Sequence, residues 1–252
     1  MSKVRLVAKL EIKGKNLIKG IQLEGLRVVG VPSESAARYY KSGIDELIYM
    51  DTVASLYGRN GLHEFVKETA ANIFIPLTVG GGVRSVSDVE NLLLSGADKV
   101  AVNTAAVKNA ELISEIANQF GSQACVVEIQ AKRQSAGEWS VMVDNGREPS
   151  NLSAERWANI VAGKGAGEIL LTSVDNDGTK KGPDIDLYDK IVKSVDVPVV
   201  ASGGFGSQSD VIDLVNKIPV SGIAIASLFH YGDVSITEMK NAMISAGIEV
   251  RR

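Results

Sequence analysis

The chain has 252 residues, 45% hydrophobic and 23% charged, a balance typical of a soluble globular protein. Its 30 acidic and 27 basic residues give a net charge of −3 without a basic run, so nucleic-acid binding is not expected. The one cysteine, Cys125, excludes an internal disulfide, and the N-terminal MSKVRLVAKLEIKG is neither a signal peptide nor a membrane span. We therefore expect a cytoplasmic protein that makes no membrane contact.

Short apolar runs rich in Val and Ile recur along the chain, and each precedes a longer amphipathic stretch. Helical patterns such as SESAARYYKSG, NAELISEIANQFG and DIDLYDKIVKSVD open on Ser, Asn or Asp, and several close on Gly. The apolar runs predict eight strands: LVAKLEI from Leu6, ELIYMDT from Glu46, PLTVGGG from Pro76, KVAVNT from Lys99, ACVVEIQAK from Ala124, EILLTSV from Glu168, VPVVASGG from Val197 and GIAIASL from Gly222.

Eight strands alternating with helices, without a Pro/Gly/Ser-rich linker, predict the α/β class and a single (β/α)8 TIM barrel as one domain over residues 1–252. An open doubly wound sheet is the alternative. It is less well supported, because the first strand is followed by EIKGKNLIKG rather than by a G-x-G-x-x-G turn.

The chain also repeats itself. TVGGGVRSVSDV from Thr78 aligns with VASGGFGSQSDV from Val200 at six of twelve positions, and KLEIK around Glu11 resembles EIQAK around Gln130. Both offsets are close to half the chain length. The sequence therefore predicts a twofold internal repeat of two half-barrels rather than a short-period solenoid.

Glycine turns follow the third and seventh predicted strands, at the barrel end where working groups gather. Glycine lets backbone amides approach an anion closely, and the start of the next helix adds its positive dipole end. The fourth and eighth strands place Asn103-Thr104 and Ala226-Ser227 beside these turns. Two such turns related by the repeat predict two phosphate half-sites, and hence a doubly phosphorylated small molecule as ligand.

Polar groups from other strands are expected at the same mouth, among them Glu11, Asp51, Gln130 and Asp177. Several such groups on one rim favour a polar active site. The two histidines are expected in surface or satisfied-core positions, no cluster has metal-ligand spacing, and no cofactor is expected.

Two cations and two anions begin four strands at the opposite end of the barrel. They are Arg5, Glu46, Lys99 and Glu168. Residues at this face usually serve stability. A ring of desolvated charges costs more than an apolar plug, which also points to a function.

The segments PLTVGGGVRS, GADKVAVNTAAV, FGSQACVV, GAGEILLTSVDNDGT and VVASGGFG make the whole chain resemble the cyclase subunits of imidazole glycerol phosphate synthase. The resemblance implies a glutaminase partner on the N-terminal face, whose ammonia crosses a charged gate and the barrel. It assigns the gate to Arg5, Glu46, Lys99 and Glu168, and the partner interface to Asp98. It assigns the phosphates to Gly82, Asn103, Thr104, Asp177, Gly178, Gly204, Ala226 and Ser227, and substrate closure to Lys19 on a mobile first loop.

The family's catalytic pair is two aspartates, and these positions hold Glu11 and Gln130 here. A carboxylate displaced by ~1 Å can cost about a hundredfold in rate. An amide cannot exchange protons near neutral pH, and general acid–base work is worth roughly 10² to 10⁴. We therefore expect impaired cyclase chemistry, with Lys19, Asp51 and Asp177 as the other catalytic candidates.

The segments YMDTVASLYGRNG and GIQLEGLRV resemble a paralogous group encoded with surface-glycan (lipopolysaccharide) genes. That resemblance implies that ammonia is delivered to a separate sugar amidotransferase that makes an acetamidino group, and the sequence favours this interpretation. A working cyclase of histidine biosynthesis is one alternative, and a non-catalytic scaffold that senses a bisphosphate is another.

Overall fold

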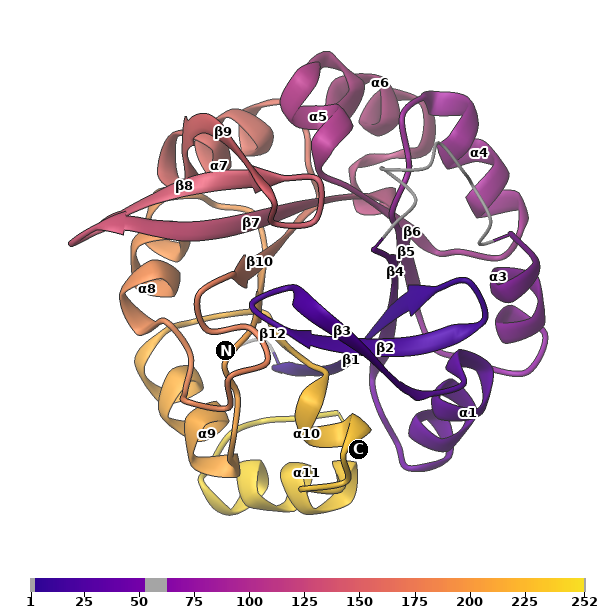
Figure 1. Cartoon of the computed structure of the whole chain (residues 1–252), viewed down its shortest axis with the longest axis vertical. Helices are drawn as coiled ribbons and strands as arrows, with labels where there is room; N and C mark the ends of the chain where they lie inside the picture. Colours follow the sequence, from indigo (N-terminus) through magenta and orange to yellow (C-terminus); the bar gives the residue numbers. More distant parts are fainter. Residues whose placement is uncertain (1–2, 53–62, 252) are drawn as a thin grey trace.

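Eight parallel strands close into a barrel in the computed structural model, which describes residues 3–52 and 63–251 (Figure 1). The order β10-β11-β12-β1-β4-β5-β6-β7 is closed by pairing of β10 with β7. Each of the eight predicted strands lies in this barrel, so the (β/α)8 prediction is confirmed. The barrel strands are β1 (Arg5–Lys13), β4 (Glu46–Asp51), β5 (Leu77–Gly80), β6 (Lys99–Val102), β7 (Cys125–Ser135), β10 (Glu168–Ser173), β11 (Val199–Ser202) and β12 (Gly222–Ile225).

Helices surround the barrel on its outside (Figure 1). The described helices are α1 (Pro32–Lys41), α3 (His63–Ala70), α4 (Val86–Leu94), α5 (Thr104–Lys108), α6 (Glu111–Phe120), α7 (Ala154–Gly163), α8 (Ile185–Ser194), α9 (Gln208–Lys217), α10 (Ser227–His230) and α11 (Ile236–Ser245), with a 3₁₀ turn at Ser122–Ala124. None within the described ranges is long and apolar enough to cross a membrane.

Side chains alternate between the two faces of each barrel strand. On β1, Leu6, Ala8 and Leu10 belong to the large core between sheet and helices. Val7 instead joins a small cluster inside the barrel with residues from the other strands, among them Val126 on β7. The same alternation directs Lys9 and Glu11 inward. The interior of the barrel is therefore apolar near its middle and charged toward the carboxyl ends of the strands.

Two β-hairpins extend the barrel at its mouth, and the sequence analysis did not predict them. β2 (Asn16–Ile21) pairs with β1 and with β3 (Glu24–Gly30), and β8 (Glu138–Val143) pairs with β7 and with β9 (Glu148–Ser153). Figure 1 shows the β2–β3 hairpin across the barrel mouth. The expectation that Lys19 lies on a loop is therefore wrong: Lys19 is a buried residue of β2, in a strand that is hydrogen-bonded on both sides, and its mobility stays a prediction.

The two hairpins make the internal repeat visible. Each half opens with a long strand, continues into a hairpin and then enters a helix. The helices that follow the two glycine turns, α4 and α9, both begin with a capping box, Ser85 with Asp88 and Ser207 with Asp210. In a capping box the serine side chain accepts from the backbone amide of the aspartate, and the aspartate side chain accepts from the backbone amide of the serine. These two bonds fix where the helix begins relative to the glycine turn.

Candidate functional site

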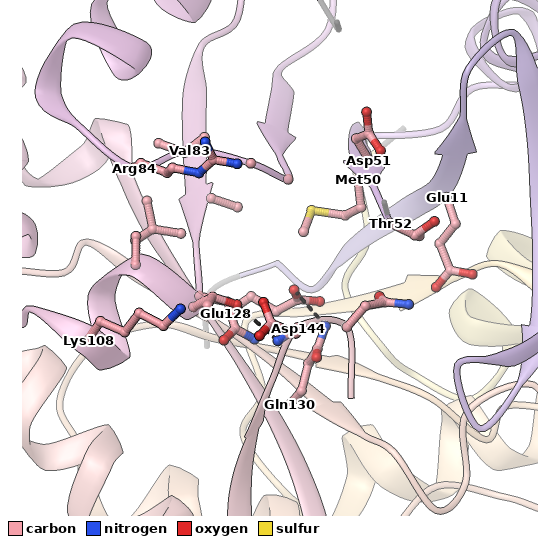
Figure 2. Close-up of a pocket in the computed structure, with 18 of the residues that line it drawn as sticks. Glu11, Met50, Asp51, Thr52, Val83, Arg84, Lys108, Glu128, Gln130 and Asp144 are labelled. Atoms are coloured by element: carbon pink, nitrogen blue, oxygen red, sulfur yellow. Dashed lines mark hydrogen bonds between the residues drawn. The ribbon is translucent and has the colours of Figure 1, made fainter. Parts of the chain in front are cut away.

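A cavity of about 330 Å³ opens at the carboxyl ends of β1, β4, β5, β6 and β7 (Figure 2). Its walls bring together six of the predicted site residues, which are Glu11, Asp51, Gly82, Asn103, Thr104 and Gln130. Arg84 and Lys108 also line it and add positive charge that the sequence analysis did not select. With Lys9, the walls therefore combine a glycine turn, three basic side chains and carboxylates.

The backbone around this cavity requires glycine. Gly81 has φ +100°, and a Cβ there would lie 2.3 Å from the Asp51 carbonyl oxygen, so no other residue fits the turn. Asn103 donates its amide to the Met142 carbonyl oxygen at 3.4 Å, and its own oxygen is buried without a hydrogen-bond partner among the described residues. The Asn145 amide nitrogen, on the β8–β9 turn, is likewise buried and unpartnered within the described ranges. Both groups line the cavity and are available to a bound molecule.

A second, much smaller pocket of about 20 Å³ lies beside the first at the ends of β10, β11 and β12. It collects the other predicted phosphate residues, Asp177, Gly178, Gly204, Ala226 and Ser227, together with Lys19. Gly204 has φ +95°, and a Cβ would lie 2.1 Å from the Gly182 carbonyl oxygen. The predicted residues thus form two adjacent pockets, one for each half of the repeat.

Lys19 forms the boundary between the two pockets. Its ammonium lies 2.9 Å from Glu11 Oε2 and 2.7 Å from Asp177 Oδ2, and all three side chains are buried. The backbone N–H of Gln22 donates to the backbone carbonyl oxygen of Asp177 at 2.7 Å, which connects the hairpin turn to the loop after β10. Lys19 therefore joins strand ends from both halves of the barrel through one cation.

Burial and charge move the pKa values of this cluster in different directions. Burial would raise the pKa of Glu11, but Lys19 and Lys9 outweigh it and lower that pKa. At Asp177, burial and the neighbouring Glu11 carboxylate outweigh Lys19 and raise the pKa. Burial would lower the pKa of Lys19, yet its two carboxylate partners raise it, so the lysine stays protonated. Two carboxyl groups with pKa values pushed apart are the usual basis for separate base and acid roles.

Two interior residues beneath Glu11 and Gln130 were missed by the sequence analysis. Lys9 Nζ lies 3.1 Å from Glu128 Oε1, and Gln130 Nε2 donates to Glu128 Oε2 at 3.0 Å. Gln130 Oε1 and Glu11 Oε1 are buried and lack a hydrogen-bond partner in the part of the chain that is described. The signal was present in the sequence, because Lys9 and Glu128 precede Glu11 and Gln130 by two residues on inward-facing strand positions.

Four charges close the opposite end of the barrel in a ring. Arg5 Nη1 lies 3.0 Å from Glu46 Oε2 and 2.9 Å from Glu168 Oε2. Lys99 Nζ lies 3.3 Å and 3.2 Å from the same two oxygens. Nearby, the exposed Asp98 accepts a hydrogen bond from the Leu77 amide at 2.8 Å.

The histidines lie outside both pockets. His63 begins α3 and contacts Ser95 at 3.2 Å. His230 is buried in α10, with Nδ1 2.7 Å from the Tyr39 hydroxyl, and burial lowers its pKa to about 3, so the ring is neutral. Over residues 3–52 and 63–251, no group of three or more His, Cys, Asp or Glu side chains is arranged to hold a metal ion.

Fold and cavity define a class, a (β/α)8 barrel of two related halves with a charged cavity at the carboxyl ends of its strands. Residues 5–235 match the family model described as histidine biosynthesis protein, and the chain belongs to this family. It is 62% identical to the imidazole glycerol phosphate synthase subunit HisF of Legionella pneumophila, over 82% of this chain and 97% of the relative. It is 46% identical to the same subunit of Bacillus cereus strains AH187 and ATCC 10987, over 98% of both chains.

These relatives correct the preferred functional interpretation. All carry the name of the histidine-pathway synthase subunit, so the prediction of ammonia delivery to surface-glycan amidation by a barrel with impaired cyclase chemistry is wrong. The comparison favours the alternative, a working cyclase subunit. That prediction gave most weight to the changed pair Glu11 and Gln130 and to two sequence segments, whereas the fold also places Lys19 between Glu11 and Asp177. Part of the segment YMDTVASLYGRNG that supported it, residues 53–61, lies outside the described residues.

Proposed function

We propose that this chain is the cyclase subunit of an imidazole glycerol phosphate synthase of histidine biosynthesis. The observation that carries the proposal is the pair of adjacent pockets, each with a glycine turn from one half of the repeat, on either side of the buried cluster Glu11–Lys19–Asp177. This arrangement suits a molecule with a phosphate at each end and its reacting atoms in the middle.

One phosphate is assigned to Gly82, Asn103 and Thr104, and the other to Gly178, Gly204, Ala226 and Ser227. Arg84 and Lys108 support the first assignment, because they add two basic side chains to the same wall. The second pocket is small with Lys19 in its present position, so we expect the β2–β3 hairpin to shift when the ligand binds.

Glu11 and Asp177 are proposed as the acid–base pair, with Asp51 as a third carboxylate on the cavity wall. The lowered pKa of Glu11 keeps it ionised as a base, and the raised pKa of Asp177 makes it the more readily protonated of the two, which suits an acid. Gln130 contributes no proton. Its amide is held by Glu128, and its buried oxygen is placed to accept a hydrogen bond from the substrate.

Ammonia is proposed to come from a glutaminase subunit docked on the N-terminal face, where Asp98 is exposed and the ring of Arg5, Glu46, Lys99 and Glu168 lies. The ring would then act as a gate at the entrance of the barrel. The names of the relatives support this part of the proposal, since each is a subunit of a synthase rather than a complete enzyme.

The direct test is turnover of the histidine-pathway ribulosyl substrate by the purified chain with ammonium salt as the nitrogen source. We expect a rate constant on the order of 1 s⁻¹, ordinary for an enzyme. Asp177→Asn and Glu11→Gln should each lower it by roughly 10² to 10⁴. The acidic limb of the pH–rate profile should lie below the ordinary carboxyl pKa of 4.5, because Glu11 has to be ionised.

Complementation of a histidine auxotroph provides a second readout. Growth with the wild-type chain and none with Asp177→Asn would support the proposal. Soluble, folded protein that binds the substrate without converting it would contradict the proposal and favour the bisphosphate-sensing scaffold instead.

A further inference from the structure

Strands β1 and β7 lie opposite each other, four places apart in either direction around the eight-stranded barrel. Side chains from opposite strands can meet only near the barrel axis. The ion pair between Lys9 on β1 and Glu128 on β7, with Nζ 3.1 Å from Oε1, therefore crosses the axis. Both side chains are almost fully buried, at 3% and 2% exposure.

This transverse pair lies between the two sites already described. Below it are the apolar interior cluster that includes Val7 and Val126, and then the charged ring. Above it is the cavity, and both Lys9 and Glu128 line the cavity from below. Thr172 on β10 contributes a third contact, with its hydroxyl 3.4 Å from Lys9 Nζ, so side chains from three strands meet at this level.

Lys9 also has a second acceptor within reach. Glu11 Oε1 lies 3.8 Å from Lys9 Nζ, is buried, and has no hydrogen-bond partner in the described part of the chain. Movement of the ammonium from Glu128 to Glu11 would exchange one ion pair for another. Lys9 keeps a carboxylate partner in either position, whereas Glu128 loses its cation, and an unpaired buried charge costs several kcal/mol, so the closed arrangement is the favoured one. Glu128 would keep the hydrogen bond from Gln130 Nε2.

We propose that the Lys9–Glu128 pair is a second barrier on the barrel axis, which opens when Lys9 transfers to Glu11 and so admits ammonia from the N-terminal side to the cavity. The inference rests on the proposed function, since it needs ammonia to travel along the axis. It assigns a role to two residues that exchange no proton in the proposed acid–base chemistry. Burial would lower the pKa of Lys9, but Glu128 and Glu11 raise it, so Lys9 stays protonated at neutral pH.

The experiment uses the chain in complex with its glutaminase subunit and compares two variants. Lys9→Arg introduces a guanidinium that can bind Glu128 and Glu11 at once and so holds the barrier shut. Lys9→Met combined with Glu128→Gln removes both charges at nearly constant volume. Lys193→Met with Asp189→Asn, an exposed pair on α8, is the matched control.

The readout is the amount of cyclised product formed per glutamate released from glutamine, measured beside the turnover with ammonium salt alone. A change in the chemistry affects both reactions, so the product-to-glutamate ratio reports passage of ammonia. We expect Lys9→Arg to lower this ratio by about tenfold, or ~1.4 kcal/mol in barrier height. The uncharged double variant and the control should keep the wild-type ratio.

An unchanged ratio in Lys9→Arg would overturn the barrier, and so would an equal loss in the uncharged double variant, which would indicate a structural requirement instead. Failure of the proposed function gives a different result. In that case the wild-type chain would form no product even from ammonium salt, and the barrier proposal would fall with it.

Discussion

At the scale of single residues, Lys19 has the largest expected effect. It is the cation between Glu11 and Asp177, so Lys19→Met leaves two buried carboxylates without their shared partner. Breaking a buried pair in this way costs about 3–5 kcal/mol. We expect a loss of this size in the free energy of unfolding, measured by urea denaturation at pH 7.

Two comparisons give this prediction its specificity. Lys15→Met, on the exposed β1–β2 turn, should change stability by less than about 0.5 kcal/mol. Adding Asp177→Asn to Lys19→Met should recover part of the lost unfolding free energy, because it removes one of the two carboxylates left without a cation. No recovery would mean that Lys19 acts through packing rather than through its charge.

The stabilisation by Lys19 should also depend on pH. Its folded-state pKa is raised above the ordinary value of 10.5, so its contribution is complete below pH 10.5 and is lost as the pH rises through the folded-state pKa. The stability difference between the wild type and Lys19→Met should therefore be constant from neutral pH to about pH 10 and shrink above it. Denaturation curves across this range would show whether it does.

The sequence predicted the glycine turns and strand-end residues of the two pockets, because the internal repeat and the strand ends identify them. Gly82 and Gly204 follow equivalent strands, and the fold places them in the adjacent pockets. Lys9 and Glu128 were not predicted, because they lie one inward-facing position deeper than the strand ends. No pattern in the sequence indicates that Lys19 reaches Asp177, since the contact depends on how the hairpin folds over the mouth.

At the scale of elements, the β2–β3 hairpin is expected to open as a unit. Leu23 at its turn packs on Met142 of β8 and on Val174 after β10, and these three residues form a separate apolar cluster. Leu23→Ala removes most of this contact, and large-to-small substitutions of this type cost about 2–5 kcal/mol. Amide hydrogen exchange in residues 16–30 should accelerate, while exchange in the barrel strands stays unchanged.

Ile21→Ala provides the control for the hairpin, because that residue is 62% exposed and does not belong to the apolar cluster of Leu23. Equal acceleration in both variants would contradict a docked hairpin. Acceleration throughout the barrel in Leu23→Ala would show that the hairpin is part of the global folding unit.

The contrast between barrel strands and hairpins has a physical cause. Barrel strands are buried on both faces, so they appear as continuous apolar runs that a sequence reveals directly. The turn between β2 and β3 uses Gln22 and Leu23 at φ +53° and +63°, where Asn-Gly would be the usual signal. The β8–β9 turn does carry that signal, in Asp144-Asn145-Gly146, and could have been predicted.

At the scale of the whole molecule, charge is layered along the barrel axis: the N-terminal ring, then the Lys9–Glu128 pair, then the Glu11–Lys19–Asp177 cluster at the mouth. An apolar layer separates the ring from the pair. Buried charges of this kind lower the stability of a fold, because each ion loses its hydration and only close partners of opposite charge offset that loss. Three such layers on one axis favour a route for a small polar molecule over a purely structural core.

The ring permits a quantitative test of this layering by a double-mutant cycle. Lys99 and Glu168 are 17% and 11% exposed, and they lie 3.2 Å apart. Lys99→Met and Glu168→Gln should each destabilise the protein, and the double variant should lose less than the sum, with an interaction energy of about 0.5–3 kcal/mol. The exposed pair Lys193–Asp189 should give only ~0.3–0.5 kcal/mol in the same cycle. Raising the salt concentration should weaken the surface pair and leave the ring nearly unchanged, because screening acts mainly on exposed charges. Additive losses at the ring would mean that its four charges interact too weakly to keep the barrel closed, and ammonia would then meet its first barrier at Lys9.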